Sequence, residues 1–125
     1  MTLLLDTHVL LWWLADDRTL KAPARRLIAD SSNKVVISAA TVWEIAIKRA
    51  LGKLTAPADL LEQIDSNRFS VLALSGPDLW LAGHLPSHHT DPFDRAILAQ
   101  TIRNGFRILT RDTRFAEYGA DTVPA

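Results

Sequence analysis

The sequence contains no cysteine. Disulfide bonds, thiolate metal sites and a cysteine nucleophile are therefore excluded, and the reducing cytoplasm is the expected compartment. Long apolar runs are also missing, since stretches such as 9–15 are too short to span a bilayer as a helix. No basic segment precedes the first apolar run, so we expect neither a signal peptide nor a membrane association.

An excess of charge of either sign is also lacking, because 14 lysines and arginines balance 14 aspartates and glutamates. Proteins that coat nucleic acid are usually basic, so this balance argues against broad electrostatic binding to RNA or DNA. Positive charge does gather in the C-terminal third, at Arg103, Arg107, Arg111 and Arg114. We interpret such runs first as solvated helix faces.

Internal repeats, low-complexity segments and linkers are absent from the 125 residues. That length and a hydrophobic content of 48% predict one folded domain, residues 1–125, with a modest apolar core. Short apolar runs predict buried strands at 3–5, 35–38, 69–74, 106–110 and near 122–123. Periodicity and end signals predict helices at 7–14, 22–29, 39–51, 59–65, 77–85 and 92–104. The alternation predicts an α/β sandwich around a mainly parallel sheet.

Two aspartates lie just after predicted strands. Asp6 follows the first strand and Asp112 follows the fourth. Each is explained, taken alone, as the N-cap of the next helical turn, which is a common position for aspartate. In parallel sheets, however, functional groups gather beyond the carboxyl ends of the strands.

Asp94 is harder to explain as a surface charge. It shares a helical stripe with Ile97, Leu98 and Thr101, so it leans toward an apolar face, where an unpaired charge is costly. A capping-box-like pairing with Asp91 is the structural alternative. We favour a functional role for Asp94 and a capping role for Asp91.

Glu44 lies in an apolar stretch of the predicted helix 39–51. Its structural alternative is a surface ion pair with Lys48, four residues later. Because parallel strands end at one edge, Glu44 and the three aspartates at positions 6, 94 and 112 are expected near the same edge. Carboxylates at close range repel, and a hard divalent cation such as Mg²⁺ or Mn²⁺ relieves that repulsion.

Four short segments resemble the PIN-domain family, and within it the VapC-type ribonuclease toxins of bacterial toxin–antitoxin pairs. They are LLDTH at 4–8, SAATVWEIAIK at 38–48, DPFDR at 91–95 and LTRD at 109–112. The resemblance implies a three-layer α/β/α fold with four to five strands in a mainly parallel sheet. It also implies Mg²⁺- or Mn²⁺-dependent endonuclease cleavage of RNA, a homodimer, and inhibition by a cognate antitoxin.

The resemblance also implies roles for individual residues. Asp6 and Asp94 are expected to be the principal metal ligands. Glu44 and Asp112 are expected to complete the acidic pocket, through water or by orienting the attacking water. Asp91 matches a further acid of this subgroup.

Four neighbours of these acids are candidates for supporting roles. Arg95 and Arg111 are candidates for holding phosphate, and ordinary ion-pair duty is the alternative that we favour. Thr7 and Thr110 are candidates for hydrogen bonds to a site carboxylate, with a backbone role as the alternative.

Other functions are weighed against this hypothesis. A phosphatase with an aspartyl nucleophile needs a second aspartate two residues after Asp6, where this chain has His8. His88 and His89 lie in a polar loop, where we expect them to face solvent, and no spacing suggests a tetrahedral zinc site.

A catalytically silent module that binds RNA or a protein stays open as an alternative, although retention of all four acids disfavours it. Trp12 and Trp13 point about a hundred degrees apart on a helix, so one of them is a candidate for a partner surface.

Overall fold

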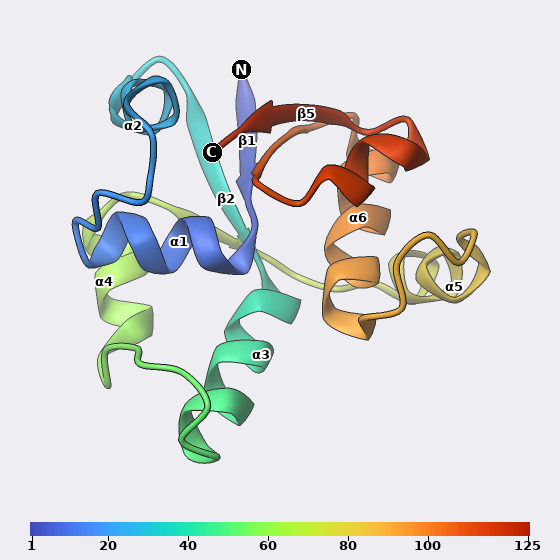
Figure 1. The fold of residues 1–125 in the computed structure, drawn as a ribbon, viewed down its shortest axis with the longest axis horizontal. Helices are drawn as coiled ribbons and strands as arrows, with labels where there is room; N and C mark the ends of the chain where they lie inside the picture. Colours follow the sequence, from blue (N-terminus) through green and yellow to red (C-terminus); the bar gives the residue numbers. More distant parts are fainter.

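The computed structural model describes residues 1–125, which form a five-stranded sheet with the order β3-β2-β1-β4-β5 (Figure 1). Every neighbouring pair of strands is parallel. The strands are β1 (Thr2–Leu5), β2 (Lys34–Ser38), β3 (Ser70–Leu72), β4 (Arg107–Thr110) and β5 (Asp121–Pro124). The predicted fold class is therefore confirmed, and the sheet is parallel throughout.

Helices cover both faces of this sheet. They are α1 (Thr7–Leu14), α2 (Ala22–Ala29), α3 (Ala39–Ala50), α4 (Leu60–Ser66), α5 (Gly76–His84), α6 (Pro92–Asn104) and the 3-10 helix η1 (Thr113–Tyr118). In Figure 1, α1, α2 and α4 lie on one side of the central strands, and α5 and α6 lie on the other. None of these helices has the length and apolar character that crossing a bilayer would require.

Alternation along the strands divides the apolar core into two layers. Leu3 and Leu5 of β1 pack into the cluster that includes side chains of α1, α2 and α4. Leu4 packs into the cluster on the opposite face, with side chains of α6 and η1. Successive strand residues point to opposite faces, so a strand buried on both sides is apolar at every position.

The register of the central strands fixes where the chain leaves the sheet. Leu5 of β1 pairs with Ile37 of β2 and with Leu109 of β4. The amide of Asp6 continues this ladder and donates to the carbonyl of Leu109, with an N···O distance of 3.1 Å. The residues that follow β1, β2 and β4 therefore emerge at one edge of the sheet.

The third strand is shorter than the predicted range 69–74. At its start, the amide of Phe69 donates to the carbonyl of Ile64 and so belongs to the end of α4. Beyond its end, Ser75 forms a capping box with Asp78 that starts α5. Hydrogen bonds to the two flanking helices thus limit the strand to three residues.

Candidate active site

Asp6 both caps a helix and faces the acidic edge of the sheet. Its Oδ1 accepts from the amide of Val9 at 2.9 Å, which caps α1, and its Oδ2 accepts from the Thr110 hydroxyl at 2.5 Å. Burial raises the pKa of Asp6 above its ordinary value, although both hydrogen bonds oppose the shift. Capping and a role in the site are therefore compatible for this residue.

Asp112 lies beside Asp6 through a shared threonine. The Thr110 hydroxyl oxygen that donates to Asp6 also accepts from the amide of Asp112, at 3.0 Å. The Arg114 guanidinium binds both carboxylate oxygens of Asp112, at 2.9 and 2.8 Å. These charge-assisted bonds hold the pKa of Asp112 below its ordinary value. Asp112 therefore stays ionised at neutral pH.

Glu44 enters the site from α3, and its side chain is buried. Its Oε1 accepts from the Thr7 hydroxyl at 2.6 Å, and its Oε2 pairs with the Lys48 ammonium at 2.5 Å. That hydrogen bond raises the pKa of Lys48. The predicted ion pair with Lys48 is present, but it joins a buried Glu44 to a half-buried Lys48 at the acidic edge.

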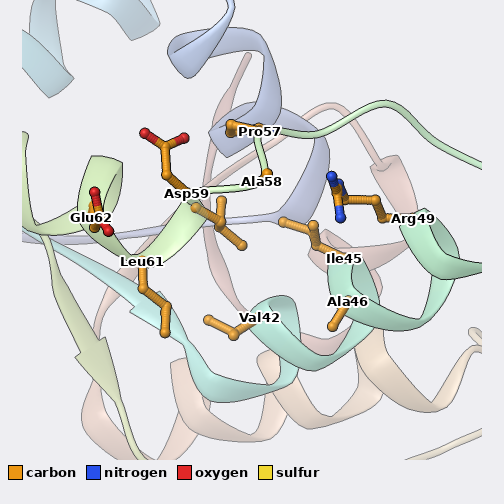
Figure 2. A pocket seen from close by; sticks show the side chains of 10 residues that line it. Val42, Ile45, Ala46, Arg49, Pro57, Ala58, Asp59, Leu61 and Glu62 are labelled. Atoms are coloured by element: carbon orange, nitrogen blue, oxygen red, sulfur yellow. The ribbon is translucent and has the colours of Figure 1, made fainter.

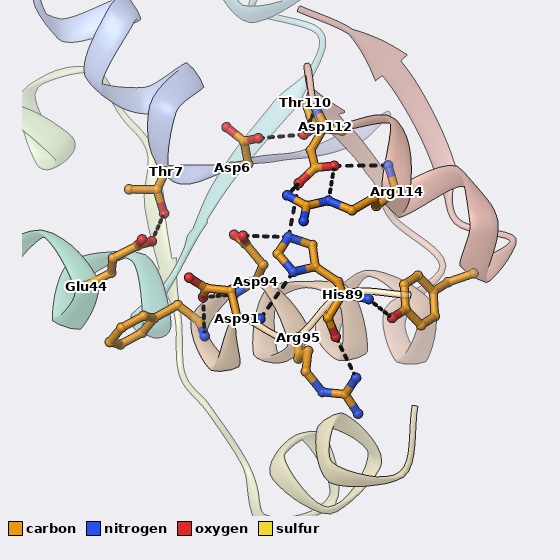
Figure 3. Close-up of polar contacts among 12 residues, drawn as sticks. Asp6, Thr7, Glu44, His89, Asp91, Asp94, Arg95, Thr110, Asp112 and Arg114 are labelled. Atoms are coloured by element: carbon orange, nitrogen blue, oxygen red, sulfur yellow. Dashed lines mark hydrogen bonds and ion pairs between the residues drawn. The ribbon is translucent and has the colours of Figure 1, made fainter. Parts of the chain in front are cut away.

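The raised pKa of Asp94 is the clearest sign that the acids lie close together. Burial raises its pKa from 3.8 to about 7. Repulsion by neighbouring carboxylates adds to this shift, and the acids responsible are Asp91, Glu44, Asp6 and Asp112. Figure 3 shows Asp6, Glu44, Asp94 and Asp112 arranged around one space, although Asp6 follows β1, Asp112 follows β4, and the other two lie on α3 and α6.

The donor set fits a hard divalent cation. Lys48 pairs with Glu44 and Arg114 with Asp112, whereas no lysine or arginine forms an ion pair with Asp94 or Asp6. Two carboxylates thus lack a countercharge beside two that are already paired. Oxygen donors of this kind suit Mg²⁺ or Mn²⁺, with water completing the coordination shell.

A family model described as "PIN domain" matches residues 3–121. The chain belongs to the PIN-domain family. The match covers β1 through the start of β5 and includes all four acids. The resemblance found in the four sequence motifs is therefore confirmed at the level of the family.

Known proteins similar to this PIN domain come from several bacteria. Ribonuclease VapC22 of Mycobacterium tuberculosis is 29% identical over 125 residues, which is 94% of this chain and 92% of that protein. The fold matches that of VapBC2 of Rickettsia felis, in a structure bound to a DNA fragment from the VapBC2 promoter. The TM-score is 0.72 and the identity 15%, over 99% of this chain and 98% of that chain. It also matches DNA-bound VapBC of Salmonella typhimurium, with a TM-score of 0.71, 19% identity and the same coverage.

Asp91 is the N-cap of α6 in this PIN domain. Its Oδ1 accepts from the amides of Phe93 and Asp94, at 2.9 and 3.1 Å. We predict that Asp91→Ala lowers the free energy of unfolding by about 1 kcal/mol, whereas Asp91→Asn, which retains a capping oxygen, lowers it much less. Urea denaturation of both variants measures this difference, and equal stability of the two would contradict the capping role.

The two arginines considered for phosphate binding make their hydrogen bonds to the backbone. The Arg95 guanidinium donates to the carbonyls of Ala82, Leu85, Pro86 and His89. Arg111 donates to the carbonyls of Thr19 and Ala125, and its guanidinium carbon lies 4.5 Å from the ring centre of Trp12. Both arginines thus hold loops and termini in place. Arg114 is the arginine that binds a site acid.

His89 is a site residue that the sequence interpretation missed. The side chain of His88 is 46% exposed, as expected for a polar loop, but that of His89 is only 4% exposed. The Nε2 atom of His89 lies 2.9 Å from Asp94 Oδ2 and 3.0 Å from Asp112 Oδ2. The sequence signal for this residue was its position two residues before Asp91, the N-cap of α6, because that position lies next to the acids at this edge of the sheet.

An apolar pocket lies apart from the acids, between α3 and the segment leading into α4 (Figure 2). Its volume is about 400 Å³. The apolar side chains that line it include those of Val42, Ile45, Pro57 and Leu61, and none of the four acids does so. The pocket and the acidic edge are therefore different surfaces of this PIN domain.

Proposed function

We propose that this PIN domain is a metal-dependent endoribonuclease and the toxin of a toxin–antitoxin pair. The observation that carries the proposal is the convergence of Asp6, Glu44, Asp94 and Asp112, with Asp94 half-buried among acids and without a lysine or arginine partner. The similarity to a protein named Ribonuclease VapC22 supports RNA as the substrate class. A catalytically silent module would have no need to retain this destabilising cluster.

The residues divide into two roles. Asp6 and Asp94 would hold the cation directly, and Glu44 and Asp112 would bind it through water or orient the attacking water. A bound Mg²⁺ or Mn²⁺ would neutralise charge on the phosphate and lower the pKa of a bound water. Glu44 can accept a proton from the attacking water, and its contact with the adjacent Lys48 holds the carboxylate in position.

The reaction is an in-line hydrolysis of an RNA phosphodiester. The water oxygen forms a new bond to phosphorus, and the bond from phosphorus to the 3′ oxygen breaks. The leaving 3′ oxygen takes up a proton, so the products carry a 3′-hydroxyl and a 5′-phosphate. Thr7 and Thr110 would hold Glu44 and Asp6 in position through the hydroxyl bonds described above.

We expect the purified protein to cleave tRNA or rRNA with Mg²⁺ or Mn²⁺ and to lose this activity in EDTA. A gel assay with end-labelled RNA, together with mapping of the new termini, measures both expectations. Cleavage that persists in EDTA would contradict the metal role. Absence of cleavage with either ion would contradict the enzyme assignment and favour the silent binding module.

A protein partner is the second part of the proposal. The structural matches are VapBC complexes, which supports a cognate antitoxin as partner. Trp43 and Trp80 are 61% and 75% exposed, and tryptophan is enriched at protein interfaces. Trp12 and Trp13, which the sequence suggested for this role, pack against the core instead. We propose that the exposed side chains of Trp43 and Trp80 contribute to binding of the antitoxin, and that the protein acts in the cytoplasm as a homodimer.

A further inference from the structure

We infer that His89 is a positioning residue, whose Nε2 donates a hydrogen bond to the carboxylate of Asp112 and contacts the carboxylate of Asp94. The inference deepens the proposed function, and its activity readout rests on that function. Its main support is geometric. One ring nitrogen reaches an oxygen of each acid, at 2.9 and 3.0 Å (Figure 3).

The hydrogen bonds of the ring determine which nitrogen carries the proton. The amide of Asp91 donates to His89 Nδ1, with an N···N distance of 3.2 Å. An amide hydrogen can point only at a nitrogen that has a free lone pair, so the ring proton is on Nε2. Nε2 therefore donates its single hydrogen, and the hydrogen bond goes to Asp112 Oδ2, while Asp94 Oδ2 lies 2.9 Å from the same nitrogen.

This tautomer argues against His89 as a metal ligand. Nε2, Asp94 and Asp112 lie close enough to hold an ion, with one donor atom from each residue within 4.8 Å of the others. To bind a metal, Nε2 would have to release its proton to Nδ1, and that proton would then face the amide hydrogen of Asp91. The loss of that hydrogen bond disfavours ligation and favours a supporting role.

The loop that carries His89 is held from three sides. The backbone amide of His89 donates to the Tyr118 hydroxyl at 2.7 Å, and that hydroxyl donates to the carbonyl of Pro86 at 2.6 Å. The backbone carbonyl of His89 accepts from Arg95 at 2.9 Å. The ring itself lies 5.9 Å from the ring of Phe115, measured between centroids. The imidazole is thus fixed before any ion binds.

A fixed neutral donor has a specific advantage at this position. It bonds one oxygen of Asp112 and contacts one oxygen of Asp94. The two repelling acids are thus held near each other without an added positive charge that would compete with the cation. Groups that orient metal ligands from behind typically change metal affinity or activity by about 10–100-fold when they are replaced. We expect an effect of that size here.

Two substitutions each retain only one of the two hydrogen-bonding functions of the His89 ring, the Nε2 donor or the Nδ1 acceptor. In His89→Gln, the amide nitrogen can take the place of Nε2 and still donate to the acids. In His89→Asn, the shorter amide can take the place of Nδ1 and still accept from the Asp91 amide, but nothing reaches the acids. The experiment measures the Mn²⁺ dissociation constant of each full-length variant by calorimetry, together with kcat and KM for RNA cleavage.

We expect His89→Asn to weaken Mn²⁺ binding by about 10–100-fold and to lower kcat with little change in KM. His89→Gln should bind Mn²⁺ within about threefold of the wild type, since the donor is retained. Wild-type affinity in both variants would overturn the inference. Equal loss in two folded variants would overturn it as well, because the donor would then not be the feature that matters.

A third variant covers the case in which neither substitution at position 89 folds. Tyr118→Phe removes the hydroxyl that fixes the loop and leaves His89 and the acids unchanged. Weaker Mn²⁺ binding in this variant would support the inference, and unchanged binding would overturn it. Failure of the proposed function looks different: the wild type then binds Mn²⁺ without cleaving RNA, and the comparison of metal affinities still tests His89.

Discussion

Replacement of Asp94 by asparagine is expected to reduce Mg²⁺- or Mn²⁺-dependent RNA cleavage by at least about 10³-fold. The substitution removes one negative charge from the centre of the acidic cluster and leaves the shape of the side chain nearly unchanged. Stabilisation of charge by a catalytic cation is worth several kcal/mol, and about 4 kcal/mol corresponds to a thousandfold in rate. The loss should appear in kcat/KM at every Mn²⁺ concentration that leaves the RNA intact.

The matched control for this experiment is Asp65→Asn. Asp65 is an exposed aspartate on α4, far from the acids in the chain and on another element, so the same chemical change there should leave cleavage unaltered. Asp6→Asn should behave like Asp94→Asn, since both are proposed as direct ligands. Undiminished cleavage by Asp94→Asn would rule out the assignment of this acid to the metal site.

In the metal-free protein at pH 8, the same Asp94→Asn substitution is expected to stabilise the fold. The native pKa of Asp94 is about 7, compared with an ordinary value of 3.8. The native state therefore disfavours the ionised carboxylate relative to the unfolded chain, in which that group is solvated. By linkage the difference corresponds to about 4 kcal/mol, of which we expect asparagine to recover about 2 kcal/mol or more.

The sign of the pH dependence follows from the raised native pKa. Between about pH 4 and pH 7 the native state binds more protons at Asp94 than the unfolded state does, so this group lowers stability as the pH rises. The unfavourable contribution is complete above pH 7 and absent below pH 4. The stabilisation by Asp94→Asn should accordingly be largest at pH 8 and vanish toward pH 4.

Urea denaturation in EDTA, at several pH values, measures this stabilisation against the Asp65→Asn control. Addition of Mn²⁺ should then reverse the order, because an ion that binds only the folded wild type stabilises it by mass action. A less stable Asp94→Asn protein at pH 8 in EDTA would contradict the repulsion inferred among the carboxylates. Equal responses of wild type and variant to Mn²⁺ would contradict the role of Asp94 as a ligand.

The sequence interpretation treated helix capping and membership of the acidic site as alternatives for Asp6 and Asp112. In the structure, each of these residues does both. Asp6 uses one oxygen to cap α1 and the other to accept from Thr110. Asp112 likewise caps η1 and binds Arg114. A carboxylate has two oxygens with several acceptor positions, so one local role does not prevent another. Local sequence shows the caps, whereas the second contact of Asp6 depends on β4, which is distant in the chain.

The arginines and histidines were the least predictable members of the site. Arg95 follows Asp94 directly in the sequence, yet its guanidinium binds carbonyls at the end of α5 and in the loop that follows it. His89 lies in a polar loop, yet it is buried against two acids. Long or flexible side chains and loop residues have no periodicity that indicates their direction, so their partners are decided by tertiary packing.

The sequence by itself determined the alternation of buried strands and helices and the positions of the acids at strand ends. Those features depend on residue polarity and on local hydrogen bonds, which act over a few positions in the chain. Only the tertiary structure decided that Asp94 is half-buried among carboxylates, that Thr110 joins Asp6 to Asp112, and that His89 reaches the site. These contacts arise from parallel pairing of β1 with β2 and β4, which brings together side chains that lie up to 104 positions apart.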